Sequence, residues 1–424
     1  MSAYTRKRWF KLDNAGKLYP AIATSRWSSV FRVSVVLKET VSPETLQTAV
    51  NRVLPRFPSM AVCMRRGFFW YYLEANDRPF TVQPDSGHPC LRFRWKENNG
   101  YLLRVLYYRQ RISVEFFHSL TDGTGGFAFL KTLTAEYLRL RGIRVPPGKG
   151  VLDVKRKPSV AETEDAFQRM PLPKTKLPRR ETTVYHLPGA MDPPHTLHLV
   201  TASLPFEEIR KRSNPLNVTV TEYIVAVLLY VCYLEQKASG KKPRPIRVSV
   251  PVNMRNYFAT ETLRNFSSFI NPGIDPRLGD YTFEEIARDV HNFMRYALNE
   301  KLLYAGIATN VADERNLLLR LFPLPIKNLA INGVFRYMGD RAMTTTLTSI
   351  GRIDAPAPMM AHVERFEAIL GASATPCCNC ALISTNDTML LTFTRNQSEA
   401  TLPREALSFL VEQGVPVTVE SNQE

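Results

Sequence analysis

A long proline-rich stretch in the middle of the chain limits how the rest can fold. Between residues 145 and 196 prolines recur among lysines and arginines, and the regular spacing of apolar residues is lost. This composition favours an extended connection over a helix or a strand. The chain has 424 residues, more than one hydrophobic core normally serves. We therefore predict an N-terminal lobe at residues 1–150, a crossover at 151–195 and a C-terminal lobe at 196–424.

Both predicted lobes alternate strands with amphipathic helices. In the first lobe, residues 30–37 alternate and are β-branched, which is typical of a strand, and Ser42 then begins a helix with a proline and an acid in its first turn. In the second lobe, Thr219 and Glu222 match a capping box ahead of the apolar helix at 223–234. The predicted fold class is therefore α/β (α+β), with helices packed on sheets in two-layer sandwiches.

Two apolar runs near the start of the chain predict a hairpin. Residues 60–64 and 68–73 are strand-like, and Arg65, Arg66 and Gly67 lie between them, where the glycine is free to adopt positive φ. The other patterns predict strands at 91–95, 101–108, 112–117, 197–204, 246–255, 345–350, 368–373, 381–384 and 389–394, and helices at 127–137, after Pro205, and at 284–303, 312–321 and 404–411.

Charge and cysteine content narrow the classes of partner. The formal net charge of +16 favours anionic ligands such as phosphorylated cofactors, acidic proteins and anionic lipid head groups. The basic residues are spread along the chain without a nucleic-acid-binding motif, so a nucleic-acid partner is not favoured. Six cysteines are too few for a disulfide framework. Cys377, Cys378 and Cys380 lack a second ligand pair at zinc spacing, so we predict no metal site.

Neither a membrane span nor a secretory signal is predicted. The longest apolar run, residues 224–234, lies between Glu222 and Glu235 and is too short to cross a bilayer. The first residues are basic and are not followed by an apolar core. These features predict a cytoplasmic protein.

One stretch of the first lobe has the residue pattern most typical of a catalytic site. The apolar run 112–117 breaks at His118, and Asp122 follows four residues later, directly before a glycine cluster. This order mounts the histidine at the end of a strand before a tight turn, where glycines let a substrate approach the backbone. A histidine with an ordinary pKa of about 6.5 can take a proton from an alcohol, amine or thiol. The glycines are Gly123, Gly125 and Gly126.

Two roles for Asp122, and a non-catalytic interpretation of the whole motif, stay open at this point. Asp122 is placed either to orient the histidine or to bind a cation that holds the turn together. The same pattern also fits a plain turn closed by an aspartate cap, with no catalytic role.

The stretch from His118 to Gly123 resembles the His-x-x-x-Asp-Gly motif of the chloramphenicol acetyltransferase-like superfamily. This superfamily includes peptide-synthetase condensation domains, polyketide-associated acyltransferases, plant acyltransferases and alcohol acetyltransferases. Residues 54–58 and the aromatic hairpin at 67–71 are similar to the alcohol acetyltransferase-like branch, and residues 251–255 are similar to its Pro-Val-Asn-x-Arg segment. The resemblance covers nearly the whole chain.

The resemblance implies two chloramphenicol acetyltransferase-like lobes that form a pseudo-dimer, with a tunnel between them. His118 is then the general base at the middle of the tunnel. It also implies that Asp122 is structural and pairs with Arg255 across the lobe interface, and that Gly123 keeps the loop tight.

The resemblance also implies that a strand of the second lobe faces His118. The segment from Thr348 to Gly351 is similar to a Ser/Thr-Asn-x-Gly strand that donates to a developing oxyanion. Ser349 replaces the asparagine of that strand, so Thr348 and Ser349 both remain candidates for the donor. Asn253 is a further candidate for contact with the oxyanion or the acceptor.

The implied activity is that of an acyltransferase. An acyl group would move from a thioester, with acyl-CoA as the expected co-substrate and no permanently bound cofactor, to a small alcohol or amine. Condensation domains usually carry a second histidine before the catalytic one, and Phe117 at that position favours a free-standing acyltransferase. Two alternatives stay open: a condensation-type enzyme served by an acidic acyl carrier protein, and a non-catalytic scaffold of the same fold.

Overall fold

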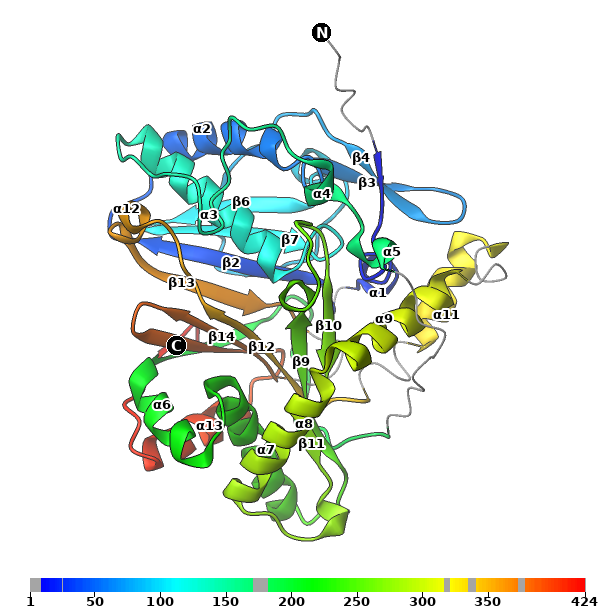
Figure 1. Cartoon of the computed structure of the whole chain (residues 1–424), viewed down its shortest axis with the longest axis vertical. Coiled ribbons are helices and arrows are strands. Elements are labelled where there is room, and N and C mark those ends of the chain that lie inside the picture. The colour runs from blue at the N-terminus through cyan, green and yellow to red at the C-terminus, as the bar shows by residue number, and fades with distance from the viewer. Residues whose placement is uncertain are drawn as a thin grey trace.

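The chain forms two large sheets, each with its own layer of helices (Figure 1). The structure is a computed structural model, which describes residues 9–24, 26–170, 182–315, 321–334, 341–372 and 378–423. In Figure 1 the first sheet lies in the upper half of the molecule and the second sheet in the lower half. The predicted α/β (α+β) class with two-layer sandwiches is confirmed.

The first sheet takes four strands from the N-terminal half and one from near the C-terminus. Helices α2 (Pro43–Val53) and α3 (Gly123–Leu140) lie along one of its faces (Figure 1). All neighbours are antiparallel except the last two in the order, which are parallel. The order is β13 (Val363–Leu370), β2 (Val30–Leu37), β7 (Arg111–Phe117), β6 (Leu103–Tyr108) and β5 (Gln83–Pro84).

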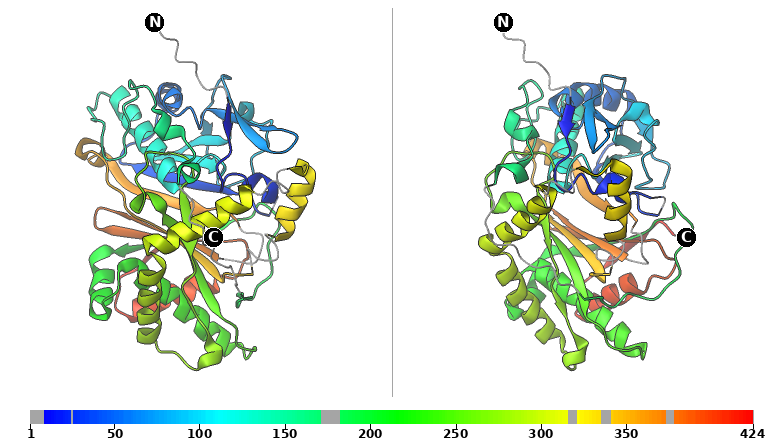
Figure 2. Two further views of the ribbon diagram at one scale, coloured as in Figure 1. Left: turned by 45° about the vertical axis from the view of Figure 1, so that its right-hand side comes forward. Right: turned by 90° about the vertical axis from the view of Figure 1, so that its right-hand side faces the viewer.

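The second sheet is built from the C-terminal half. Its helices, α6 (Phe206–Ser213), α7 (Val220–Ala238), α8 (Phe283–Ala297) and α13 (Thr401–Glu412), gather on the side away from the first sheet (Figures 1 and 2). The order is β10 (Ser267–Ile270), β9 (Ile246–Asn253), β12 (Thr345–Arg352), β14 (Cys378–Thr385), β15 (Thr388–Arg395), β8 (His198–Pro205) and β16 (Thr418–Ser421), and β11 (Gly273–Ile274) also pairs with β9. Strand β12 is parallel to both β9 and β14.

Smaller elements flank the sheets. A three-stranded sheet has the order β1 (Trp9–Lys11), β4 (Tyr71–Ala75) and β3 (Val62–Arg66). The remaining helices are α1 (Tyr19–Ile22), α4 (Val160–Thr163), α5 (Ala166–Arg169), α9 (Glu300–Arg315), α11 (Leu324–Val334) and α12 (Ala357–Met360). Among the described residues no single helix is long and apolar enough to cross a membrane. The helical segments Phe206–Leu216 and Val220–Ala238 meet that length and composition only when taken together, and they are bent by 81° relative to each other.

Local start signals predicted where α2 and α7 begin, but the single helix predicted at 284–303 is wrong, because α8 ends at Ala297 and α9 begins at Glu300. Helix α2 begins at Pro43, and Ser42 Oγ accepts a hydrogen bond from the Thr45 backbone N–H at 3.2 Å. The capping box at α7 is present, because Thr219 and Glu222 each bond the other's backbone N–H. The predicted helix at 312–321 corresponds to the end of α9, and residues 316–320 lie outside the described chain.

The predicted strand at 91–95 is wrong, since this segment pairs with no strand. The free edge of β6 is taken by β5 instead. The predicted hairpin forms, but its turn runs from Gly67 to Trp70, and Gly67 does not have positive φ. A Cβ on Gly67 would lie 2.7 Å from the Trp70 carbonyl oxygen, so close approach of the backbone is what requires the glycine.

One strand crosses between the predicted lobes. Strand β13 lies within the range 196–424, yet it pairs with β2 along its whole length. The strand predicted at 368–373 is this one, and residue 373 lies outside the described chain. The C-terminal range therefore contributes one strand to the sheet of the first lobe, while the boundaries at 150 and 195 stay a prediction.

The two hydrophobic cores meet across the second sheet. Cys380 and Leu382 of β14 belong to the core under α7, whereas Ala381 and Ile383, which point the other way, belong to the core of the first sheet. One face of the second sheet therefore packs on its own helices and the other faces the first lobe.

Candidate active site

His118 lies one residue beyond β7 and continues its ladder. Its backbone N–H donates to the Ser29 carbonyl oxygen at 2.9 Å. The imidazole is stacked on Tyr19 of α1, with ring centroids 4.4 Å apart, and it also contacts Phe31 of β2 at 5.0 Å. These aromatic rings restrict the rotation of the imidazole and partly bury it.

Asn265, from the second lobe, determines which ring nitrogen of His118 carries the proton. The Asn265 side-chain N–H group donates to the His118 carbonyl oxygen at 2.9 Å, so its Oδ1 is the atom that faces His118 Nδ1, at 3.2 Å. An amide oxygen only accepts hydrogen bonds, so Nδ1 must carry the proton in the neutral ring. Nε2 is then left with a free lone pair.

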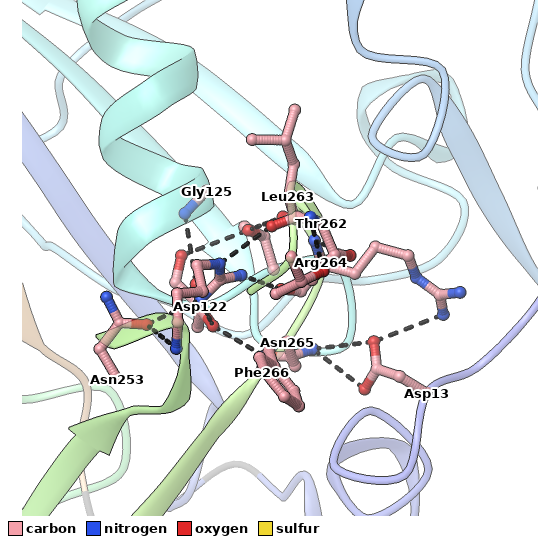
Figure 3. A network of polar contacts seen from close by, with 12 residues as sticks. Asp13, Asp122, Gly125, Asn253, Thr262, Leu263, Arg264, Asn265 and Phe266 are labelled. Atoms are coloured by element: carbon pink, nitrogen blue, oxygen red, sulfur yellow. Dashed lines mark hydrogen bonds and ion pairs between the residues drawn. The ribbon is translucent and has the colours of Figure 1, made fainter. Parts of the chain in front are cut away.

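A buried carboxylate holds the amide in this orientation. Both oxygens of Asp13 lie 3.3 Å from Asn265 Nδ2 (Figure 3). Asp13 is fully buried, accepts from the Gly16 N–H at 2.6 Å and lies 3.4 Å from Arg264 Nη2. Burial raises the pKa of Asp13. A flipped amide would face its oxygen toward this carboxylate, which accounts for the orientation.

Asp122 joins the two lobes. Its Oδ1 accepts from the Gly125 N–H at 3.2 Å, which caps α3, and its Oδ2 accepts from the Phe266 N–H and from Arg255 Nη1, both at 2.8 Å (Figure 3). The predicted contact with Arg255 is therefore present. Because both oxygens are used in this way, Asn265 rather than Asp122 contacts the histidine ring.

Arg255 is held by the loop that surrounds it. It lies in a short 3-10 helix (Met254–Asn256) after β9, and its guanidinium donates to the carbonyl oxygens of Thr262 and Arg264 at 3.0 and 2.5 Å. Asn253 Oδ1 accepts from Arg255 at both the backbone N–H and Nη1. The oxygen of Asn253 is thus occupied in positioning the arginine.

The electrostatics of the site favour a neutral histidine. Burial lowers the pKa of His118, and the charge of Asp122 opposes this shift with a smaller effect. At neutral pH the imidazole is therefore mainly in its neutral form, and Nε2 is able to accept a proton.

Gly123 and Gly125 differ in the space around them. A Cβ on Gly123 would have no atom within 4 Å, whereas a Cβ on Gly125 would overlap Thr121 Oγ1 and the Leu263 carbonyl oxygen. Thr121 Oγ1 itself donates to that carbonyl at 2.6 Å. The tight packing expected at Gly123 is found at Gly125, where the turn touches the second lobe.

Thr348 and Ser349 point to opposite faces of the second sheet, because side chains alternate along a strand. Ser349 Oγ lies 2.8 Å from Thr221 Oγ1 in the first turn of α7, so it faces the helices. Thr348 is paired with Ala381, which packs in the core of the first sheet. Of the two residues, Thr348 faces the lobe that carries His118.

Sequence reasoning missed Asn265 and Asp13. The asparagine lies 147 residues from the histidine in the chain, in a loop without a recognised motif. Asp13 carries a weak signal, because it directly follows the alternating run at 9–12 and such a position can be buried. Nothing in the local pattern pairs the two residues.

A cavity of about 660 Å³ begins beside this network, and its lining includes Phe266, the residue after Asn265. Tyr257, Phe258 and Tyr304 give it an aromatic wall. The predicted tunnel through His118 stays a prediction. Within the described residues no group of three or more His, Cys, Asp or Glu side chains is arranged to hold a metal ion.

No protein-family model and no curated protein matches the chain. Solved structures do match it. Polyketide synthase associated protein 5 from Mycobacterium tuberculosis is 15% identical, with 95% of this chain and 96% of that chain covered and a TM-score of 0.62. TRI101 from F. graminearum, complexed with coenzyme A and T-2 mycotoxin, is 11% identical, with 96% and 99% covered and a TM-score of 0.63.

A third match is the first condensation domain of the calcium-dependent antibiotic synthetase, at 13% identity, 96% coverage of both chains and a TM-score of 0.61. Identities this low show the fold and no more. The fold expected from the sequence, that of the chloramphenicol acetyltransferase-like and condensation-domain proteins, is confirmed.

The contrast between the two glycines gives a matched pair of variants. Gly125→Ala forces a shift at Thr121 and Leu263, so we expect a loss of about 1–3 kcal/mol in the free energy of unfolding. Gly123→Ala enters open space on a helix and is expected to change it by less than about 0.5 kcal/mol. Urea unfolding of both variants measures the difference, and equal losses would contradict this account of the turn.

Proposed function

We propose that this chain, which has the chloramphenicol acetyltransferase-like fold, is an acyltransferase that moves an acyl group from a thioester to an alcohol or amine. One observation carries the proposal: Asn265 Oδ1 lies 3.2 Å from His118 Nδ1, which leaves Nε2 of a neutral, partly buried imidazole free to take a proton. A general base of this kind contributes roughly 10²–10⁴ in rate.

In the proposed mechanism His118 Nε2 removes the proton of the acceptor hydroxyl or amine as that atom attacks the thioester carbonyl carbon. A carbon–oxygen or carbon–nitrogen bond forms and the carbonyl oxygen becomes an oxyanion. The tetrahedral intermediate then collapses, the carbon–sulfur bond breaks, and the imidazolium returns its proton to the leaving thiolate. Asp122 and Arg255 do not touch the substrates in this proposal, but keep the histidine turn against the second lobe.

We assign the oxyanion donor to Thr348. Its side chain faces the first lobe, while the Ser349 hydroxyl is engaged with Thr221 on the far face of the sheet. A hydroxyl donor preorganised at the oxyanion lowers the barrier without any reorganisation during the reaction.

Acyl-CoA is the proposed donor. The net charge of +16 favours an anionic substrate, and the similar structure of TRI101 is a complex with coenzyme A. The similarity to a condensation domain supports a second candidate, a condensation-type enzyme that takes an acyl or peptidyl group from an acidic carrier protein.

Mass spectrometry of the products formed from a panel of acyl-CoA donors with alcohol and amine acceptors tests the activity. We expect an ester or amide with the intact chain and about 10²–10⁴-fold less of it with His118→Ala. A carrier-dependent enzyme would react only with the acylated carrier protein. An active His118→Ala variant with normal thermal unfolding would contradict the mechanism.

The pH profile separates a positioning role for Asn265 from a merely structural one. In wild type the acidic limb of kcat/KM should lie below the ordinary histidine pKa of about 6.5, because burial lowers the pKa of His118. Asn265→Asp puts a carboxylate beside the ring, favours imidazolium and raises that pKa. Since neutral histidine is the active form, the limb should move to higher pH.

A control for this variant is Asn51→Asp on the exposed surface of α2, which should leave the limb in place. Asn265→Ala removes the partner of Nδ1 without adding charge, and should lower kcat by about 10²-fold through misplacement of the ring. A limb that Asn265→Asp does not move would rule out contact between this residue and the base.

The oxyanion assignment predicts a difference between two neighbouring positions. Thr348→Val removes the proposed donor with little change of shape, so we expect kcat to fall by about 10²–10³-fold. Ser349→Ala loses only the bond to Thr221 and should keep kcat within about 3-fold, for a cost of about 1 kcal/mol in stability. Steady-state kinetics decides between them, and the reverse order would assign the donor to Ser349.

A further inference from the structure

A second cavity, of about 1040 Å³, lies beside the first sheet and is lined by basic and aromatic side chains. A small neighbouring cavity shares Leu91, Arg92, His195 and Thr196 with it and also reaches Ser28. The larger cavity is lined by His88, Leu91, Arg92, Phe93, Arg94, Trp95, Glu97, Arg104, Pro194, His195 and Thr196.

This cavity is on the opposite face of the sheet from His118. Phe116 packs on Phe129 of α3 and stacks with Phe31, which contacts the His118 ring, so all of these lie on the helix-covered face. Glu115 points the other way, because side chains alternate along β7. Arg104, in the cavity wall, pairs with Glu115 at 3.1 Å. The cavity is therefore separate from the proposed reaction centre.

The charge in the cavity is positive. Arg94 Nη1 lies 3.4 Å from Glu97, the one carboxylate of the lining, and both side chains are exposed. The charge of Arg104 is balanced by the carboxylate of Glu115 on the neighbouring strand β7. Within the described chain no carboxylate lies at ion-pair distance from Arg92, whose side chain is exposed. At least one guanidinium is thus available for an anion, and a planar guanidinium matches a phosphate with two parallel hydrogen bonds.

Aromatic rings stand next to these arginines. The Arg104 guanidinium lies 4.1 Å from the centre of the Phe93 ring. Trp95 forms a T-shaped contact with Tyr71 and is 39% exposed, so part of the indole is open to a ligand. A cavity with a free guanidinium and an open indole suits a ligand that carries both a phosphate and a planar ring.

Two further features lie in or next to the cavity. His195 has a φ of 77°, a strained backbone conformation for a residue with a side chain, and such strain persists where the surrounding structure holds it. The hydroxyl of Ser28 is buried in the wall of the small cavity and has no hydrogen-bond partner among the described residues. A polar atom of this kind is normally satisfied, which points to a polar ligand group or water.

We propose that this cavity, named here the Arg92 pocket, binds a nucleoside phosphate, with the phosphate on Arg92 and the base stacked on Trp95. A nucleotide is favoured over a nucleic-acid polymer, because the arginines and the tryptophan used here line a single cavity. The phosphate belongs either to a free nucleotide or to the nucleotide end of coenzyme A.

Calorimetric titration of the full chain with ADP tests the pocket without any turnover, so it does not depend on the proposed acyl transfer. ADP should bind once per chain, and adenosine and inorganic phosphate should each bind at least about 10-fold more weakly because each lacks half of the recognised features. Arg92→Ala and Trp95→Ala should each weaken ADP by about 10-fold or more, and higher salt should weaken it further. Both side chains are exposed, so neither change should unfold the protein.

Arg210→Ala is the matched control, since Arg210 is an exposed arginine on α6, paired with Glu207. It should leave the ADP affinity unchanged. Titration with coenzyme A distinguishes the two sources: an equal loss of affinity in Arg92→Ala assigns the pocket to coenzyme A, and an unchanged affinity assigns it to a free nucleotide. Absence of ADP binding, or equal ADP affinity in wild type, Arg92→Ala and Trp95→Ala, overturns the proposal.

Discussion

The carboxylate of Asp122 is the interaction on which the site depends, because it joins the two lobes at the histidine. One oxygen caps α3 of the first lobe, and the other accepts from the backbone of Phe266 and the guanidinium of Arg255 in the second lobe. The ion pair is mostly buried, with 11% and 7% of the two side chains exposed. Loss of one partner would leave a buried charge, which costs about 3–5 kcal/mol. The turn that carries His118 is therefore fixed by contacts from a distant part of the chain.

The chemistry of the proposed base follows from what lies next to it. A carboxylate beside Nδ1 would favour the charged ring by its negative charge, whereas the amide of Asn265 is neutral and keeps the proton of the neutral ring on Nδ1. The carboxylate of Asp13 lies behind the amide and fixes its direction. Burial then lowers the pKa of His118. Together these contacts supply a neutral base whose free nitrogen is defined.

Much of the fold, and part of the site, could be predicted because those features are encoded locally. The strand at 30–37 is specified by its own β-branched residues, and the helix after Ser42 by the residues of its first turns. The strand predicted at 91–95 does not form, because the edge of β6 is paired with β5 and local patterns do not show which edge is free. The pairing of β13 with β2 was also beyond local patterns, because the two strands are more than 300 residues apart in the chain. His118, Asp122 and Arg255 came from motifs, but the contact of Asn265 with His118 depends on two loops that only the fold brings together.

The protonation state of His118 is the most direct test of its proposed role as a neutral general base. Nitrogen NMR of the chain with labelled histidine, with the His118 signal assigned by its loss in His118→Gln, reports both the pKa and the protonated nitrogen. We predict a pKa below the ordinary value of about 6.5 and a neutral ring with its proton on Nδ1. A raised pKa, or a neutral ring with its proton on Nε2, would contradict it.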